Sequence, residues 1–196
     1  MKTQQINSDL ISKILTTVDA GLSSGLGNPK PGEMCVEAAV CYAMGLPHGD
    51  DPGCVGSAVR AFKIALNDKG WSSPLARAKG LRRLAVAQLG SLEVNQVEFS
   101  KQLALETIRQ ILPIALRAIG LEKNAVQCEK AKTLKEAKIA AAAAAATNAA
   151  AAYAATNAAN AAYAEKDRIL SLSAEIAVQI LVKLGSEGSK FLYLCE

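Results

Sequence analysis

The chain has 196 residues and a formal net charge of +4, and 51% of its residues are apolar. This length supports one domain with a hydrophobic core, with room for an appendage. The net charge is too small to indicate a nucleic-acid-binding protein, so nucleic acid is not an expected partner. Aromatic residues are few and alanine is abundant, so Leu, Ile and Val must provide most of the core.

No targeting or membrane segment is expected. The first residues, Met1–Asp9, are polar and lack the apolar stretch of a signal peptide. No window of about twenty residues is apolar enough for a membrane span, because alanine inserts weakly and polar residues interrupt the alanine run. The five cysteines are odd in number and irregular in spacing, which argues against a disulfide scaffold. These features predict a cytoplasmic protein with reduced thiols and no membrane partner.

Start and stop signals up to residue 120 are those of helices. Asn7 or Ser8 can cap the first helix. Asp51–Pro52 and Ser73–Pro74 each combine an N-cap residue with proline at the first helical position. Asn95, followed three residues later by a glutamate, has the pattern of a capping box. The five expected helices cover residues 9–20, 33–44, 52–69, 74–90 and 95–120.

Two breaks are expected within this region. Pro113 removes a backbone donor and should bend or interrupt the fifth helix before Gly120. The segment Gly25–Gly32 holds two prolines and three glycines, which predicts a loop. It resembles neither a P-loop nor a dinucleotide-binding turn, because no Lys-Ser/Thr pair follows and no strand precedes it.

The composition changes after residue 120. A charged helix is expected over 122–138, followed by an almost pure alanine helix over 140–164, since alanine has the highest helix propensity. An amphipathic helix follows over 165–184, and Phe191–Leu194 can form a short extended tail. The sequence therefore predicts an all-α fold, a bundle of about seven helices that includes a long alanine-rich helix.

Two regions are expected: a helical core domain over 1–120 and an alanine-rich region over 121–196 packed on it. The alanine helix should carry a polar and aromatic stripe from Tyr153, Asn157 and Asn160 and, one position round, from Thr156 and Tyr163. This face could bind a ligand or pair with a second copy, so a homo-oligomer is expected. Ice-binding helices also place threonine on alanine, but Thr147 and Thr156 are nine residues apart and so on opposite faces.

The segment after the glycine-rich loop gathers three of the five cysteines, the only histidine and four carboxylates. In a catalytic site, Cys35 or Cys54 would be the nucleophile, His48 the base, and Asp50 or Asp51 the orienting acid. Cys54 is expected in the first turn of its helix, where the helix dipole lowers a thiol pKa. The alternative is structural, with Asp51 as a cap and the cysteines as small hydrophobic residues. The ligand spacing of structural zinc sites is absent, so no metal or other cofactor is expected.

The third and fourth expected helices carry seven Lys or Arg residues and one Asp. Arg60 and Lys63 share one helix face, and Arg82 and Arg83 stand with Lys79 on the next helix. If these helices pair antiparallel, the cations could frame a pocket for a phosphate or carboxylate. Otherwise they form a solvated face, as long cationic side chains often do.

One motif runs through this region: Gly32-Glu-Met-Cys-Val36, Tyr42, Gly45, Pro47, Asp50, Pro52, Cys54-Val55 and Asn67-Asp68. It resembles a family of bacterial proteins of unassigned activity, over about residues 32–90. Members of that family carry Trp in place of His48 and His in place of Asp51. The resemblance therefore implies that Asp50, Cys35 and Cys54 are the shared polar elements. The alanine-rich tail is also similar to immunity proteins of bacterial conflict systems.

From these features we expect a non-catalytic cytoplasmic binding protein of a bacterial or phage conflict system that sequesters a small anionic signal of the nucleotide type. The expected ligand-binding residues are Arg60, Lys63, Arg82, Arg83, His48, Asp50 and Asp51. One alternative is a hydrolase or transferase that uses Cys54, Cys35, His48 and Asp50. The other is a protein-binding immunity or scaffold module that uses the alanine helix.

Overall fold

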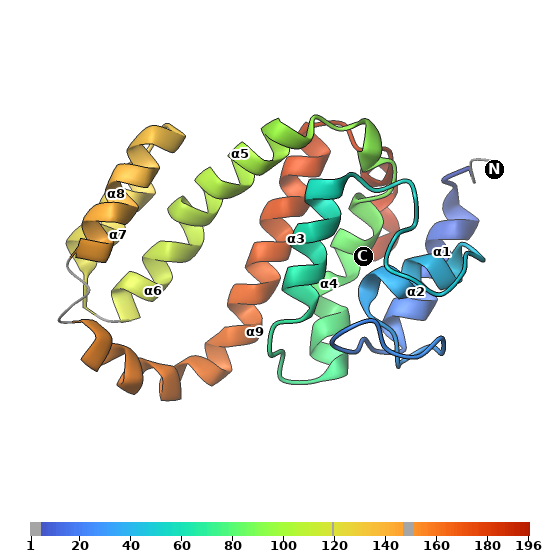
Figure 1. The fold of residues 1–196 in the computed structure, drawn as a ribbon, viewed down its shortest axis with the longest axis horizontal. Helices are drawn as coiled ribbons and strands as arrows, with labels where there is room; N and C mark the ends of the chain where they lie inside the picture. The colour runs from blue at the N-terminus through green and yellow to red at the C-terminus, as the bar shows by residue number, and fades with distance from the viewer. Residues whose placement is uncertain (1–4, 119, 147–150) are drawn as a thin grey trace.

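The computed structural model describes residues 5–118, 120–146 and 151–196, and the side chains of all of these except 144–146 and 151–164. This part of the chain is all-α and contains nine α-helices and no β-strand (Figure 1). The α-helices are α1 (Ser8–Asp19), α2 (Val36–Ala43), α3 (Ser57–Asn67), α4 (Pro74–Ala87), α5 (Gln96–Glu106), α6 (Leu112–Ala118), α7 (Glu122–Lys130), α8 (Leu134–Ala146) and α9 (Ala151–Lys183). Three further short segments are the 3₁₀ helices η1 (Ser91–Glu93) and η3 (Glu187–Cys195) and the π-helix η2 (Thr107–Ile111). The predicted fold class is confirmed, and none of the described helices is long and apolar enough to cross a membrane.

Three of the predicted N-caps close hydrogen bonds at the start of their helices. Asn7 Oδ1 accepts the Leu10 N–H at 3.0 Å in α1. Ser73 and Asn95 make the equivalent bonds in α4 and α5, each also at 3.0 Å. Each cap satisfies a backbone donor that the first helical turn leaves unpaired. The starts of α1, α4 and α5 therefore follow from local sequence.

The predicted start of the third helix is wrong. Asp51 Oδ1 accepts the N–H of Gly53, two residues on, at 2.9 Å, which closes a tight turn. Gly53 has a φ of 71°, in the left-handed region, so the chain does not enter a helix there. The helix begins only at Ser57, and Cys54 consequently lies in the loop before α3.

The count of described α-helices is nine because two predicted helices, over 95–120 and 122–138, are each divided. The helix boundary expected between residues 164 and 165 is wrong, since α9 runs through it. The π-helix η2 separates α5 from α6, and the Leu112 N–H bonds to the Thr107 carbonyl, five residues back. This shift of register comes directly before Pro113, which has no N–H to donate. The charged stretch 122–138 is divided between α7 and α8 at residues 131–133.

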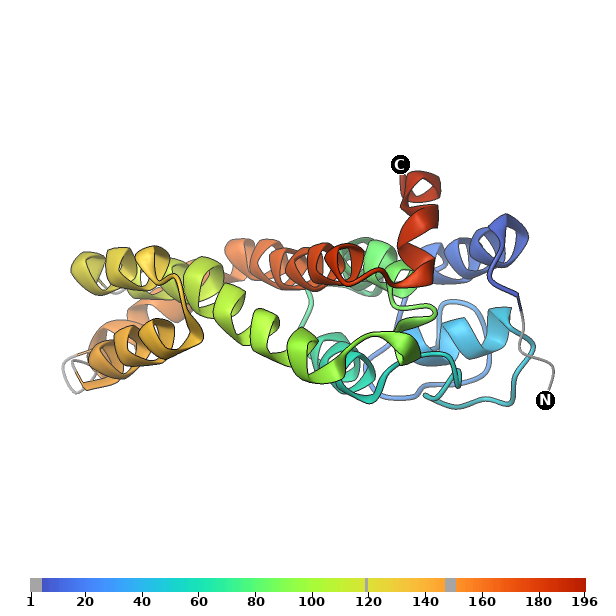
Figure 2. The ribbon, with the colours of Figure 1, turned by 90° about the horizontal axis from the view of Figure 1, so that it is seen from above.

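Two further expectations concern the alanine-rich region and the tail. The predicted extended tail is wrong, because η3 is a 3₁₀ helix. The side chains of the predicted polar and aromatic stripe lie outside the described residues, as do Thr147 and Asn148. The long helix α9 runs from the end of the molecule that holds α7 and α8 to the helices around α3 and α4, as Figures 1 and 2 show.

The main hydrophobic core lies between α1, α2, α3, α4 and the C-terminal half of α9. Its fully buried side chains include Ile11, Ile14, Leu81, Leu84 and Leu181. The core therefore draws on residues on both sides of position 120.

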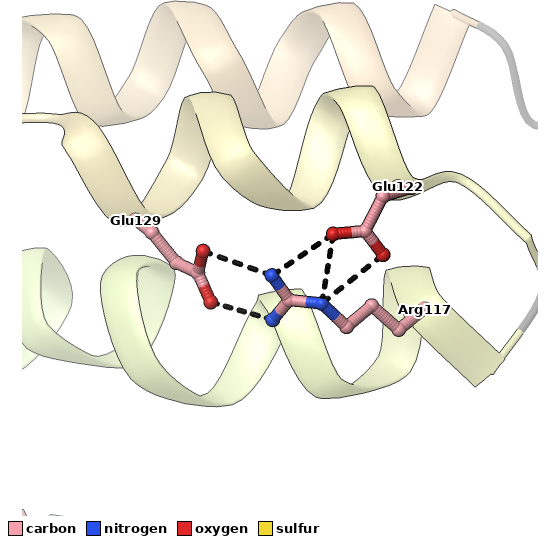
Figure 3. Close-up of polar contacts among 3 residues, drawn as sticks. All are labelled: Arg117, Glu122 and Glu129. Atoms are coloured by element: carbon pink, nitrogen blue, oxygen red, sulfur yellow. Dashed lines mark hydrogen bonds and ion pairs between the residues drawn. The ribbon is translucent and has the colours of Figure 1, made fainter.

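A second, smaller cluster holds α6, α7 and α8 at the end of the molecule opposite α1 and α2 (Figure 1). Its buried residues are Leu116, Ala125, Cys128 and Ala140. Arg117 joins α6 to α7 by two bonds to Glu129, at 2.5 and 2.9 Å, and three to Glu122 at 3.2 Å (Figure 3). The bidentate pair with Arg117 lowers the pKa of the Glu129 carboxyl.

Candidate functional site

The candidate site lies where the loop between α1 and α2 folds against the end of α3. Asn67, only 1% exposed, accepts the Val36 N–H at 3.2 Å and donates to the Ser23 carbonyl at 3.0 Å. Asp68 accepts the Gly25 N–H at 2.7 Å. Val36 begins α2, whereas Ser23 and Gly25 belong to the loop. One Asn-Asp pair at the end of α3 thus holds both the loop and the start of α2.

The glycine-rich loop is held closely in this position. Gly27 forms an isolated antiparallel bridge with Met34 and has a φ of 71°. A Cβ at this position would collide with the Glu33 carbonyl, so only glycine fits. Buried Arg77 donates to the Leu22 carbonyl at 2.7 Å and anchors the start of the loop. The loop therefore forms a fixed wall beside α2 and α3.

A cavity of about 150 Å³ lies between this loop, the start of α2 and the end of α3; we call it the α2–α3 pocket. Its polar lining consists of Cys35, Glu37, Asp50, Asn67 and Asp68, and its larger apolar side chains are Leu26, Val36 and Ile64. This space corresponds to on the order of five water molecules, at the ~30 Å³ that each occupies in the liquid. The lining carries three carboxylates and no Lys or Arg.

Glu37, which lines the α2–α3 pocket, belongs to a fully buried ion pair. Its side chain is 0% exposed, and its Oε2 lies 2.9 Å from the Nζ of Lys63, which is also 0% exposed. Gln88 Nε2 donates to the same Oε2 at 3.2 Å. Glu37 Oε1, Lys63 Nζ and Gln88 Oε1 have no aligned hydrogen-bond partner, so Lys63 and Glu37 form an ion pair held by charge. Three buried polar atoms without aligned partners therefore gather at the Glu37 carboxylate.

Burial dominates the ionisation of this pair. It raises the pKa of Glu37 and lowers the pKa of Lys63, while their mutual attraction acts in the opposite direction on each. A buried polar atom without a partner costs about 1–3 kcal/mol.

The three cysteines near the pocket have the properties of structural thiols. Cys35 Sγ accepts the Ala38 N–H at 3.3 Å and caps α2. Burial raises the pKa of Cys35 and Cys54, and that of Cys41 to about 12. The predicted effect of a helix dipole on Cys54 is wrong, because Cys54 precedes α3. With pKa values above the ordinary thiol range, these groups are protonated at neutral pH.

The remaining members of the expected catalytic set do not meet at one place. His48 Nε2 lies 3.0 Å from the Gly27 carbonyl oxygen, so the ring contacts the loop. Asp50 is exposed and lines the α2–α3 pocket. Asp51 forms an ion pair with Arg60. The structure therefore brings Cys35 and Asp50 to one pocket, while His48 contacts the loop before α2 and Asp51 the loop before α3.

The cations expected to bind an anion are each paired with a carboxylate. The pairs are Arg60–Asp51, Lys63–Glu37, Arg82–Asp19 and Arg83–Glu175. Their partners belong to the loop before α3, to α2, to α1 and to α9. The structure thus does not gather these four cations into one pocket.

Arg83 does line a second cavity, an open depression of about 380 Å³ between α4 and α9; we call it the α4–α9 depression. Lys79 and Arg168 also line it, together with Glu175, which lies 3.1 Å from Arg83 Nε. Arg168 additionally pairs with Glu165. Three cations against one carboxylate make the charge of this lining positive, opposite to that of the α2–α3 pocket.

Sequence reasoning missed Glu37 and Gln88 as site residues. A signal for Glu37 was present, because it stands in an otherwise apolar helix where a charge is rarely buried without a partner. No such signal marks Gln88, near the end of α4, because an uncharged amide is common on any helix face. Only the packing of α4 against α2 and α3 brings this amide to the Glu37 carboxylate.

Comparisons with family models, with curated proteins and with solved structures found no match to this chain. The resemblance to a bacterial family thus stays a prediction. Within the described residues, no group of three or more His, Cys, Asp or Glu side chains is placed to hold a metal ion. Function is therefore argued from the two cavities and their side chains.

Proposed function

We propose that this chain is a non-catalytic binding protein that holds a small molecule in the α2–α3 pocket. The observation that carries this proposal is the α2–α3 pocket itself, a cavity of about 150 Å³ in which Cys35, Asp50, Asn67 and Asp68 lie beside apolar side chains. Pockets that bind small molecules combine apolar walls with a few converging polar groups. The α2–α3 pocket has this composition, and its walls are fixed by Asn67, Asp68 and Arg77.

Binding without chemistry agrees with the state of the thiols. A cysteine nucleophile needs a thiolate and a base within hydrogen-bond reach. Burial raises the pKa of Cys35, and the His48 ring contacts a loop carbonyl. These features favour binding over the alternative of a cysteine hydrolase or transferase.

The anionic signal expected from the sequence gives a second candidate, at a different place. Arg83, Lys79 and Arg168 line the α4–α9 depression, where an anion could compete with Glu175 for Arg83. The charge of the α2–α3 pocket is opposite and disfavours an anion there. A role in bacterial or phage conflict, which rests on the resemblance, is compatible with either cavity.

Native mass spectrometry of the full chain purified from expressing cells tests the proposal. The wild-type protein should retain a small molecule, and Ile64→Phe, which fills the α2–α3 pocket, should lose it. Leu75→Phe is the matched control, because Leu75 is an exposed residue of α4. Retention by Ile64→Phe together with loss from Arg83→Ala would transfer the function to the α4–α9 depression. No retained mass, and no stabilising compound in a thermal-shift screen of metabolites, would contradict both candidates.

A further inference from the structure

An open groove of about 430 Å³ lies between α5 and α8, beside the start of α3; we call it the α5–α8 groove. Its apolar lining consists of Ala58, Val97, Ala104 and Leu134. Val97 is 65% exposed and Leu134 is half-buried, so both can be covered further by a partner. The groove shares no residue with the α2–α3 pocket, so its role is independent of the small molecule proposed above.

The uncharged polar side chains of the groove are already engaged within the chain. Gln96 Oε1 accepts the Ala58 N–H at 3.1 Å. Gln96 Nε2 donates to the Ser91 and Val94 carbonyls, each at 2.8 Å. Ser100 Oγ donates to the Gln96 carbonyl at 2.9 Å. The groups left for a partner are therefore the apolar side chains and the charged residues.

The charged residues of the groove are both lysines. Lys101 belongs to α5 and Lys138 to α8, so each wall contributes one, and both are exposed. In the part of the chain that the structure describes, neither lysine belongs to a salt bridge and no Asp or Glu lines the groove. The closest carboxylates along the two helices, Glu98 and Glu136, already accept hydrogen bonds. A partner with carboxylates beside its apolar groups therefore complements this groove.

The shape of the groove indicates what carries those carboxylates. A groove between helices receives the apolar face of a further helix, with anchors at positions i, i+4 and i+7. Val97 and Ala104 are seven positions apart on α5, about 10 Å at about 1.5 Å per residue, which is the span of those anchors. We propose that the α5–α8 groove binds an acidic amphipathic helix of a partner protein. The apolar face of that helix covers Val97 and Leu134, and its flanking carboxylates pair with Lys101 and Lys138.

Selection of peptides on the full protein tests this assignment. The probe is a phage-displayed library of helix-forming peptides of about 18 residues, in which apolar, acidic, basic and neutral polar residues are equally frequent. The wild-type protein should enrich peptides with a net negative charge and apolar residues at i, i+4 and i+7. A synthetic copy of the most enriched peptide is then titrated calorimetrically, and its affinity should fall as the salt concentration rises.

One variant removes the apolar anchor of the groove. Val97→Asp should weaken binding of the enriched peptide about tenfold or more, the effect of losing one buried valine contact. This variant should fold, because Val97 is exposed in the first turn of α5, where an acidic residue is favourable. Val182→Asp is the matched control and should leave the affinity unchanged, since Val182 is 50% exposed on α9 and does not line the groove.

A second variant reverses the charge of the groove. The double variant Lys101→Glu, Lys138→Glu should weaken binding of the acidic peptide about tenfold or more, because two ion pairs are replaced by two repulsions. A new selection on this variant should enrich basic peptides instead of acidic ones. Lys13→Glu, on the exposed face of α1, is the matched control and should change neither the affinity nor the selected charge.

Several results would overturn the proposal. They are a selection without enrichment, enriched peptides without an acidic excess, and equal affinity of the enriched peptide for Val97→Asp and the wild type. Wild-type binding to vesicles of phosphatidylserine and phosphatidylcholine that Val97→Asp abolishes, without peptide enrichment, would assign the groove to a membrane surface. A wild-type dimer that Val97→Asp dissociates in sedimentation analysis would assign it to a second copy of the chain.

Discussion

Replacing Lys63 by methionine should destabilise the protein by about 3–5 kcal/mol, the cost of removing one partner from a buried ion pair. The size of the effect follows from the burial of Glu37, which is 0% exposed and would retain one donor, Gln88 Nε2 at 3.2 Å. Methionine keeps most of the volume of the lysine stem, so the cavity contribution is small. Since domains of this kind are stable by on the order of 5–15 kcal/mol, the loss would be a large part of the total.

The effect of Lys63→Met should depend on pH. Burial already raises the pKa of Glu37 in the folded protein, and loss of the lysine charge raises it further. A carboxyl whose folded pKa lies above its unfolded value, ~4.3, does not penalise folding below that value. The penalty grows as the pH rises towards the folded pKa. Lys63→Met should therefore cost less at about pH 5 than at about pH 8.

Urea unfolding followed by circular dichroism measures these changes. Lys69→Met, on the exposed surface after α3, is the matched control and should shift the free energy of unfolding by less than about 0.5 kcal/mol. The double variant Lys63→Met, Glu37→Gln should recover about 2 kcal/mol or more, because it leaves no uncompensated charge. A cost below about 1 kcal/mol for Lys63→Met, or additive costs in the double variant, would refute the reasoning.

Two further predictions concern other contacts of the fold. Asn67→Ala should lower the free energy of unfolding by about 2 kcal/mol, because it leaves the buried Val36 N–H and the Ser23 carbonyl without their partner. Urea unfolding measures this change, and a value under about 0.5 kcal/mol would contradict the prediction. The pair with Arg117 lowers the folded pKa of Glu129, so its stabilisation is present above the unfolded pKa and is lost as the pH falls through the folded value. Hydrogen exchange in α6 and α7 should accordingly speed up on acidification, relative to α1, in the wild type, and the extra acid sensitivity should be absent in Arg117→Ala.

The sequence by itself determined the features whose causes are local. Helices start after Asn7, Ser73 and Asn95 because the side-chain oxygen of each residue accepts a backbone N–H of the first helical turn. This hydrogen bond does not depend on the rest of the chain. Asp51–Pro52 shows the limit of this reasoning. An aspartate oxygen can cap a helix or close a tight turn. Here Asp51 closes a turn, because Gly53 adopts the left-handed φ of 71° that this turn contains.

Only the tertiary structure decided what the charged side chains do. From the sequence, Lys63 could face solvent, an anion or a carboxylate, because all three environments suit a lysine on an amphipathic helix. Its partner Glu37 comes from α2 and the donor Gln88 from α4, and their meeting depends on how three helices pack. The α2–α3 pocket exists for the same reason, since its walls come from segments separated along the chain and joined by Asn67 and Asp68.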